Sequence, residues 1–277
     1  MDQRSRAIRT LDVDLRRALG EGQLDLHYQP VVSAQNCEVR GFEALLRWYH
    51  PDRGLVPPVE FIPLAESNGL IASIGEWVVQ RACRDAMHWP GDTKVAVNLS
   101  PAQFKNPSLF DTVVSALDAS GLPSSRLELE ITESVLLQES DVALATLHRL
   151  RECGVRISLD DFGTGYSSLS YLRSFPFGKI KIDQSFVREL SQRADCAAIV
   201  RAIAALGESL GMTTTAEGVE TFEQLKQLRE MGCRELQGYL FGLPQMASAV
   251  KMWLRTFAVR AEQTVAKTAA PESRAVA

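Results

Sequence analysis

The sequence predicts a (β/α) barrel, because short apolar strands alternate with helical segments along most of the chain. A second observation is that these strands repeatedly carry a carboxylate, an amide or a lysine on one face only. A third is length, since about eight such units in roughly 250 residues are typical of a TIM barrel. An open doubly wound sheet is the alternative, but no glycine-rich phosphate loop follows an early strand. The barrel is therefore favoured.

Seven segments have the period-two alternation of β-strands. In the first of them Phe42 and Ala44 share one face, whereas Glu43 and Arg47 share the other. A half-exposed antiparallel sheet alternates in the same way, so one strand alone decides nothing. Strands that are separated by helices pair in parallel through right-handed crossovers, and their succession favours the barrel. The segments are 41–48, 94–100, 126–132, 156–160, 179–183, 213–217 and 235–239.

The segments between these strands have helical patterning and recognisable ends. Thr221 and Gln224 form a capping box, and Gly232 closes the helix that follows it. Ser140 or Asp141 can cap an earlier helix. The remaining helical signals are the apolar stripes of 70–89 and 195–210 and the stops at Gly154 and Gly211.

Composition indicates one ordinary globular domain. The chain has 277 residues, of which 45% are hydrophobic and 23% are charged, and no linker rich in Pro, Gly or Ser divides it. We expect a domain over 12–258, an N-terminal extension over 1–11 and a disordered tail over 259–277. The net charge of −4 argues against binding of long nucleic acids, which requires a surplus of Lys and Arg. A small phosphate ligand held through metal ions is compatible with this charge.

Cysteine and histidine usage argues against zinc. The five cysteines never form a CxxC pair, which is typical of reduced thiols in an intracellular protein, and the four histidines have no ligand spacing. Hard cations such as Mg²⁺ or Mn²⁺ suit the oxygen-rich inventory better. The sequence contains no run of 18 or more apolar residues, so we expect a cytoplasmic chain without membrane contact. The sequence leaves open whether a longer parent protein carries a sensory domain or a membrane anchor.

The segment DDFGTGYSSL is the most specific chemical signal. Asp160 ends a strand and Asp161 begins a loop in which Gly163 and Gly165 permit unusual backbone angles. Ser167 or Ser168 can then cap a short helix that ends near Pro176. Adjacent carboxylates can bridge two divalent cations about 3.5 to 4 Å apart. An Asp-Asp pair before a glycine turn is more often only a turn and cap, so this segment needs independent support.

That support comes from polar residues on four strands that project the same way, namely Glu43, Asn98, Glu130 and Asp160. Such groups would repel one another and lose hydration unless cations balanced them, so their convergence predicts a metal site. Lys181, inward-facing on the next strand, can orient a water molecule and neutralise charge that develops on a phosphate.

The same residues lie in segments that closely resemble the EAL-domain cyclic-di-GMP phosphodiesterases. The resemblance covers about residues 12–255. Its segments are HYQP at His27, EALLRW at Glu43, FIPLAE at Phe61, VNLSP around Asn98, ELEITES at Glu128, DDFGTGYSSL at Asp160, KIDQSFV at Lys181, AEGVET at Ala216 and QGYLFG at Gln237.

The resemblance implies a modified TIM barrel with a reversed first strand, acting as a homodimer that hydrolyses cyclic di-GMP to linear 5′-pGpG. By position, the first of two Mg²⁺ or Mn²⁺ ions would be held by Glu43, Asn98, Glu130 and Asp160. Asp160 and Asp161 would hold the second ion, with Glu217 nearby. Lys181 would position the attacking water, and Glu217 is similar to the proposed general base. Arg47 and Gln237 are similar to substrate-binding positions, Glu133 to the anchor of the DFGTG loop, and Glu220 to a supporting residue.

Two alternatives remain. Some proteins that resemble this family have lost activity and serve as cyclic-di-GMP receptors or interaction modules, but here every expected acidic position is filled, which favours the enzyme. The carboxylates could also form an ion network that binds no metal, which a metal titration would distinguish. The chain departs from the family pattern at Gly178 and at 242–243, and the sequence assigns no consequence to either departure.

Overall fold

The computed structural model describes residues 2–137, 141–164, 172, 175 and 177–255. Within them, eight strands close into a barrel, in the order β1-β9-β8-β7-β6-β5-β4-β2 and back to β1. The strands are β1 (Leu24–Ser33), β2 (Val39–His50), β4 (Lys94–Leu99), β5 (Leu127–Thr132), β6 (Arg156–Phe162), β7 (Lys179–Ile182), β8 (Thr213–Ala216) and β9 (Glu235–Gln237). The short strands β3 (Gly54–Val56) and β10 (Gln245–Met246) extend the sheet beside β2 and β1.

The first barrel strand is reversed. β1 is antiparallel to both of its barrel neighbours, β2 and β9, whereas the other neighbouring barrel strands are parallel. β1 and β2 form a long hairpin, so β1 leads to the end of the barrel where β2 begins. The predicted modified TIM barrel with an antiparallel first strand is thus confirmed.

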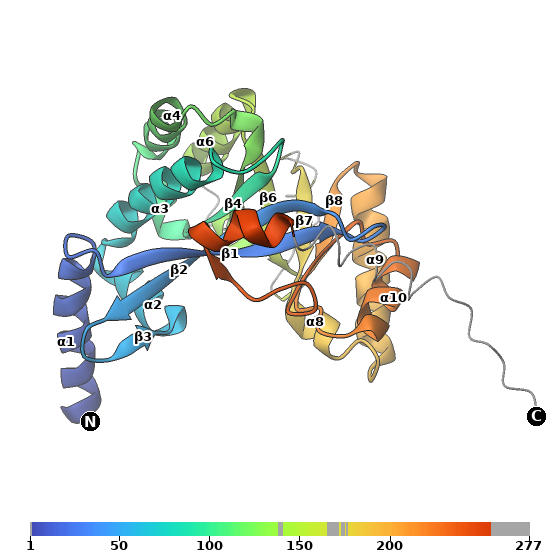
Figure 1. Ribbon diagram of the computed structural model, residues 1–277, viewed down its shortest axis with the longest axis horizontal. Helices are drawn as coiled ribbons and strands as arrows, with labels where there is room; N and C mark the ends of the chain where they lie inside the picture. The colour runs from blue at the N-terminus through green and yellow to red at the C-terminus, as the bar shows by residue number, and fades with distance from the viewer. Residues whose placement is uncertain (1, 138–140, 165–171, 173–174, 176, 256–277) are drawn as a thin grey trace, which may run out of the picture.

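Helices surround the strands, with α3, α4 and α6 on one side and α9 and α10 on the other (Figure 1). Their bounds are α1 Asp2–Ala18, α2 Pro58–Asn68, α3 Ile71–Ala86, α4 Leu109–Ser120, α5 Glu133–Leu137, α6 Asp141–Glu152, α8 Gln184–Arg188, α9 Ala194–Ser209 and α10 Phe222–Glu230. Two 3₁₀ turns lie at Pro101–Lys105 and Ser124–Arg126. No helix within the described ranges is both long and apolar enough to cross a membrane.

Several predicted element ends are found. The Thr221 hydroxyl accepts the Gln224 N–H at 3.2 Å, and the Gln224 side-chain oxygen accepts the Thr221 N–H at 3.0 Å, so the capping box of α10 is confirmed. The stripe predicted over 70–89 forms a helix that ends at Ala86, before Pro90, whose ring disfavours helical geometry in the residue ahead of it. The caps predicted at Ser140, Ser167 and Ser168 lie outside the described residues.

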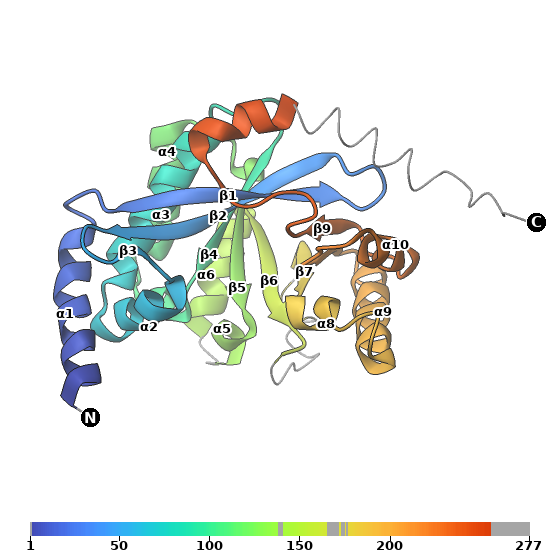
Figure 2. The same ribbon diagram turned by 60° about the horizontal axis from the view of Figure 1, so that its bottom comes forward.

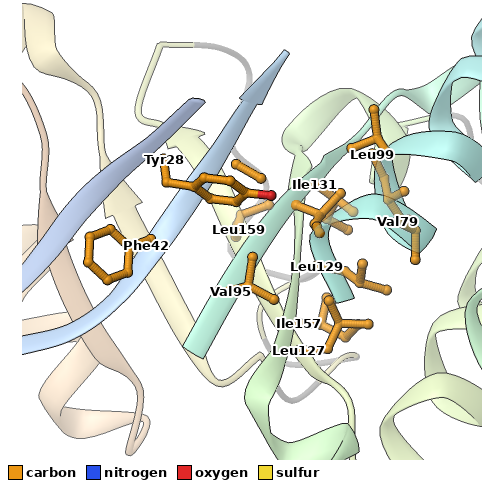
Figure 3. Close-up of a cluster of buried hydrophobic side chains, with 14 of the residues drawn as sticks. Tyr28, Phe42, Val79, Val95, Leu99, Leu127, Leu129, Ile131, Ile157 and Leu159 are labelled. Atoms are coloured by element: carbon orange, nitrogen blue, oxygen red, sulfur yellow. The ribbon is translucent and has the colours of Figure 1, made fainter. Parts of the chain in front are cut away.

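The apolar core lies outside the barrel wall, between strands and helices. Figure 3 shows outward-facing side chains of β4, β5 and β6, among them Val95, Leu129 and Ile157, gathered with Val79 of α3. Burial of each such side chain contributes about 1.5 to 3 kcal/mol. The interior of the barrel is instead polar. Its buried side chains include Glu43, Glu128, Glu130, Ser158, Lys181, Thr215, Glu235 and Gln237.

Candidate active site

The polar interior side chains meet at the end of the barrel where the parallel strands finish. Asn98 on β4 lies in register with Glu130 on β5, and Asp160 on β6 follows one layer further along. Glu43 lies on β2, which pairs with β4 in the sheet. The carboxyl ends of parallel barrel strands are where TIM-barrel active sites form. The structure therefore brings together the four residues predicted from strand parity.

Lys181 lies among these side chains. We call the four carboxylates around it the acidic cluster, namely Glu43, Glu130, Asp160 and Glu217. The lysine is only 1% exposed. The distances from its Nζ are 2.6 Å to Glu217 Oε1, 2.8 Å to Glu130 Oε2, 3.2 Å to Asp160 Oδ1 and 3.6 Å to Glu43 Oε2. One ammonium thus faces four carboxylates, which leaves an excess of negative charge that further cations can balance.

Two amides fix the orientation of Glu43. Asn98 Nδ2 donates to Glu43 Oε1 at 2.6 Å, and Gln237 Nε2 donates to Glu43 Oε2 at 2.6 Å. The same Gln237 nitrogen lies 3.2 Å from Gln29 Oε1. Among the described residues, Gln237 Oε1 is buried without a hydrogen-bond partner, so it can accept from a ligand or a water.

A second set of oxygens lies beside the first. One carboxylate oxygen each from Asp160, Asp161 and Glu217 lies within 4.8 Å of the others, a spacing that could hold a metal ion. Asp161 has a left-handed backbone conformation with φ 53°, and its N–H donates to Asp160 Oδ1 at 3.0 Å. An all-oxygen donor set of this kind fits Mg²⁺ or Mn²⁺ and disfavours zinc. The chemistry of the donors therefore agrees with the expected cations.

The carboxyl groups compete for ionisation. Burial, followed by neighbouring carboxylates, raises the pKa of Asp161 to about 6. Burial also raises the pKa of Glu217 to about 8, and that of Glu130 well above its usual value. Burial opposes ionisation of Glu43, but Lys181 and the two amide donors outweigh it and hold the pKa of this carboxyl below its usual value. The site therefore retains protons unless more positive charge enters it.

The charge of Lys181 is secured by the same carboxylates. Burial disfavours the ammonium form, but Asp160, Glu130 and Glu217 outweigh burial and raise the pKa of Lys181. Lys181 is therefore a fixed cation rather than a proton donor near neutral pH.

The loop after β6 is tied to the end of β5. Glu133 Oε1 accepts the Gly163 N–H at 3.0 Å. Gly163 has φ 97°, and a Cβ there would lie 3.1 Å from Phe186, so a larger residue would be both strained and crowded. This contact joins the first turn of α5 to the predicted DFGTG loop.

Two clefts meet at Leu45 beside the acidic cluster. The polar one, of about 310 Å³, is lined by Glu43, Asp160, Glu217, Glu220 and Gln237, among others. The apolar one, of about 500 Å³, is lined by Arg47, Asn98 and aliphatic side chains such as Ile62 and Ile74. Arg47 and Glu220 thus lie at the walls of the clefts rather than in the acidic cluster.

Strand parity missed a further cleft residue, Gln29, on the reversed strand β1. Gln29 is paired in register with Glu43 and lines the polar cleft. The signal was available, because Asp25, His27 and Gln29 alternate with Leu24, Leu26 and Tyr28. Gln184 and Arg188 also line this cleft, but they lie after the end of β7, where parity predicts no direction. Tyr239 lines it too, in phase with Gln237 within the predicted segment 235–239.

The chain matches the model of the EAL domain over residues 12–244. A solved structure of PaMucR phosphodiesterase in complex with c-di-GMP superimposes with a TM-score of 0.84 and 49% identity, covering 87% of this chain and 99% of that one. MucR of Pseudomonas aeruginosa, a bifunctional diguanylate cyclase and cyclic di-GMP phosphodiesterase, is 50% identical over 84% of this chain and 35% of its own length. The cyclic di-GMP phosphodiesterase PdeR of Escherichia coli is 39% identical over 94% of this chain and 40% of its own length. The chain thus spans well under half the length of these relatives.

Proposed function

The chain belongs to the EAL domain family, and from this membership we propose that it is a phosphodiesterase that hydrolyses cyclic di-GMP to linear 5′-pGpG. The observation that carries the proposal is the complete acidic cluster closed around Lys181 at the carboxyl ends of the barrel strands. A barrel that served only as a scaffold would not need this concentration of buried charge, which is costly to desolvate.

Two Mg²⁺ or Mn²⁺ ions fit the donors present. Glu43, Asn98, Glu130 and Asp160 would hold one ion, and Asp160 with Asp161 would hold the other, near Glu217. Such ions, when bound, polarise phosphoryl oxygens and favour ionisation of water.

The remaining chemistry belongs to the side chains. Lys181 offers a fixed positive charge that can orient the attacking water and offset the charge that builds on the phosphate. Glu217 has a pKa of about 8 in the metal-free chain and is mostly protonated there near neutral pH, so divalent cations would have to favour its ionised form before its carboxylate could take a proton from that water. Arg47 offers a planar pair of donors for a phosphate at the cleft wall. Gln237 keeps Glu43 in one orientation.

The clefts support a substrate with two nucleotide halves. The polar and apolar clefts adjoin at Leu45, and the acidic cluster lies beside that junction. A cyclic dinucleotide could place one scissile phosphate at the cluster while its bases extend into neighbouring space. The solved PaMucR and FimX EAL-domain structures contain c-di-GMP, which supports the same ligand class for this chain.

The decisive experiment is to incubate the purified chain with cyclic di-GMP and Mg²⁺ or Mn²⁺, and to separate the products by chromatography. We expect pGpG as the product, and we expect a chelator to abolish its formation. Glu43→Ala should abolish turnover because it removes a ligand of the first ion, whereas Glu152→Ala, at an exposed position on α6, should behave as the parent chain does. Wild-type product formation by Glu43→Ala would reject the assignment of Glu43.

The alternative of a receptor or interaction module has a distinct outcome in the same assay. Such a module would bind cyclic di-GMP without turnover and would need no divalent ion. The filled acidic positions favour turnover. We also propose that the chain works as a homodimer in the cytoplasm, and that further domains of a longer protein regulate it, as the length of its relatives suggests.

A further inference from the structure

A second cavity lies at the opposite end of the barrel, where the parallel strands begin. It has a volume of about 670 Å³ and is bounded by the turn after β1, the starts of β2, β8 and β9, and the end of α10. Figure 2 shows the tip of the β1–β2 hairpin beside β9 and α10, which agrees with the pairing of Ser33 with Glu235. Cavities of this size commonly hold small molecules.

Among the described residues, three arginines line this cavity, Arg40, Arg229 and Arg234, against one acid, Glu235. The Glu235 carboxylate is already engaged, because its Oε2 lies 2.9 Å from Lys179 Nζ and accepts the Thr215 hydroxyl at 3.1 Å. Three guanidinium groups in the lining thus face one carboxylate that already has a lysine partner.

The partners of two of these arginines are easily exchanged. Arg40 Nη2 lies 3.8 Å from Glu38, and Arg234 Nη2 lies 3.7 Å from Glu208. All four side chains are at least 49% exposed, and ion pairs that are long and exposed contribute little. An anion in the cavity can compete with them.

The third arginine is held in place. Arg229 Nε donates to the Ala34 carbonyl, and its Nη2 lies 3.2 Å from Cys37 Sγ. The Ala34 N–H in turn donates to the Arg234 carbonyl at 2.8 Å, which joins the hairpin turn to the start of β9. The wall is thus preformed, which reduces the ordering cost of binding.

Charge beyond the lining adds to the effect. Lys94 and Arg156 begin two further strands at this end of the barrel. Burial and the nearby Arg156 charge lower the pKa of Lys94, as expected where positive charge accumulates. The chain as a whole has a net charge of −4, whereas this end concentrates Arg and Lys side chains that can attract small anions.

We propose that this cavity binds a phosphorylated small molecule at a site separate from the acidic cluster. The guanidinium fork matches the oxygens of a phosphate, and the Ser33 and Thr213 hydroxyls supply further polar contacts at the wall. The phosphate can belong to an inorganic polyphosphate or to a nucleotide, since both present the same group.

Isothermal titration calorimetry of the whole chain with pyrophosphate, tripolyphosphate and ATP tests this proposal. A chelator keeps divalent ions away from the acidic cluster, so binding there is disfavoured by like charge. We expect saturable one-to-one binding that is at least about tenfold weaker in the variant Arg40→Gln/Arg234→Gln. Both positions are exposed, so the fold should survive. The matched control is Arg193→Gln, an exposed arginine before α9, which should bind as the parent chain does.

The comparison of ligands identifies the source of the phosphate. Tighter binding of ATP than of tripolyphosphate would assign a nucleotide, and equal binding would assign the phosphate chain alone. The proposal is overturned by equal affinity in the double variant and the parent, or by no saturable binding below about 10 mM. It is also overturned if Lys181→Ala removes the binding, because the anion would then occupy the other end of the barrel.

Discussion

At the scale of single residues, Lys181 determines how the acidic cluster works. A buried lysine that faces four carboxylates stabilises both the fold and any transition state that brings more negative charge. We expect Lys181→Ala to lower kcat about 100- to 1000-fold with a much smaller change in KM. Steady-state kinetics with cyclic di-GMP measure both quantities, and Lys226→Ala on the exposed face of α10 is the control. A loss carried mainly by KM would contradict a role in the transition state.

The raised pKa values of the carboxyl groups predict a pH dependence of metal binding. Glu217 has a pKa of about 8 and faces Lys181, Asp160 and Glu43, while Asp161 has a pKa of about 6 and faces Asp160 and Asp183. As pH rises from 6 to 8 these groups lose protons, so the metal-free fold is destabilised by uncompensated charge. A divalent cation relieves that repulsion and displaces the remaining protons.

We therefore expect Mn²⁺ to raise the Tm more at pH 8 than at pH 6. Thermal unfolding at both pH values, with and without the ion, measures the difference. Calorimetry in buffers of different ionisation enthalpy should also detect proton release when Mn²⁺ binds at pH 7. An equal Tm shift at the two pH values together with no proton release would contradict the shifted titration of Glu217 and Asp161.

Residue alternation was sufficient to predict the direction of Glu43, Asn98, Glu130 and Asp160, because each lies within a strand whose other face is apolar. It could not predict that Lys181 would contact all four carboxylates, since that depends on how strands far apart in the sequence close around the barrel. Nor does it decide the roles of these residues, which depend on ligands and on kinetics.

At the scale of secondary-structure elements, Glu133 connects α5 to the loop that follows β6. Its carboxylate accepts the Gly163 N–H, and hydrogen bonds to charged groups contribute about 1.5 to 3 kcal/mol. We expect Glu133→Ala to reduce kcat about tenfold or more by releasing the loop that directly follows Asp161 and Phe162 at the end of β6. Glu133→Gln retains an acceptor oxygen and should recover much of the rate. Kinetics and sedimentation of both variants test activity and dimerisation. If Glu133→Ala behaved as the parent chain does, Glu133 would have no role in holding the loop.

The ends of elements were predictable where side-chain chemistry marks them, as at the capping box of Thr221 and Gln224. The helix α1 was not anticipated, because its first turns are strongly polar. Leu11, Leu15 and Ala18 nevertheless form a buried stripe at helical spacing, and this stripe was the available signal. β9 is shorter than the predicted strand: it ends at Gln237, and the next residue, Gly238, lies so close to the Val219 backbone that a Cβ would not fit.

At the scale of the whole molecule, apolar side chains pack on the outside of the barrel wall, and charged side chains are buried inside the barrel. The apolar residues form a layer between strands and helices (Figure 3). The barrel interior holds buried charged side chains such as Glu43, Glu130 and Lys181. The parity of the strands predicts this arrangement once the barrel is assumed. The basic cavity at the far end was not predicted, because its three arginines come from the start of β2, the end of α10 and the residue before β9, which only the closed fold brings together.

At the end of the barrel where the parallel strands begin, Lys179 of β7 joins two strands that do not neighbour one another. Its Nζ lies 2.7 Å from Glu128 Oε1 on β5 and 2.9 Å from Glu235 Oε2 on β9. Burial disfavours the charge of this lysine, but the two carboxylates outweigh it and raise its pKa. The buried charges of this ion triad are therefore compensated when the barrel closes, and closure of the barrel in turn depends on that compensation.

Removing this lysine should be costly for the fold, because it leaves two buried carboxylates without a counter-ion. We expect Lys179→Met to lower the free energy of unfolding by about 3 to 5 kcal/mol, the range measured when one partner of a buried ion pair is removed. Urea denaturation of the metal-free chain measures the loss. Lys179→Met combined with Glu235→Gln should restore part of the stability, since one of the stranded charges is removed together with its partner. If the single variant were as stable as the parent chain, or if the double variant lost the sum of the two single effects, closure of the barrel would not depend on this triad.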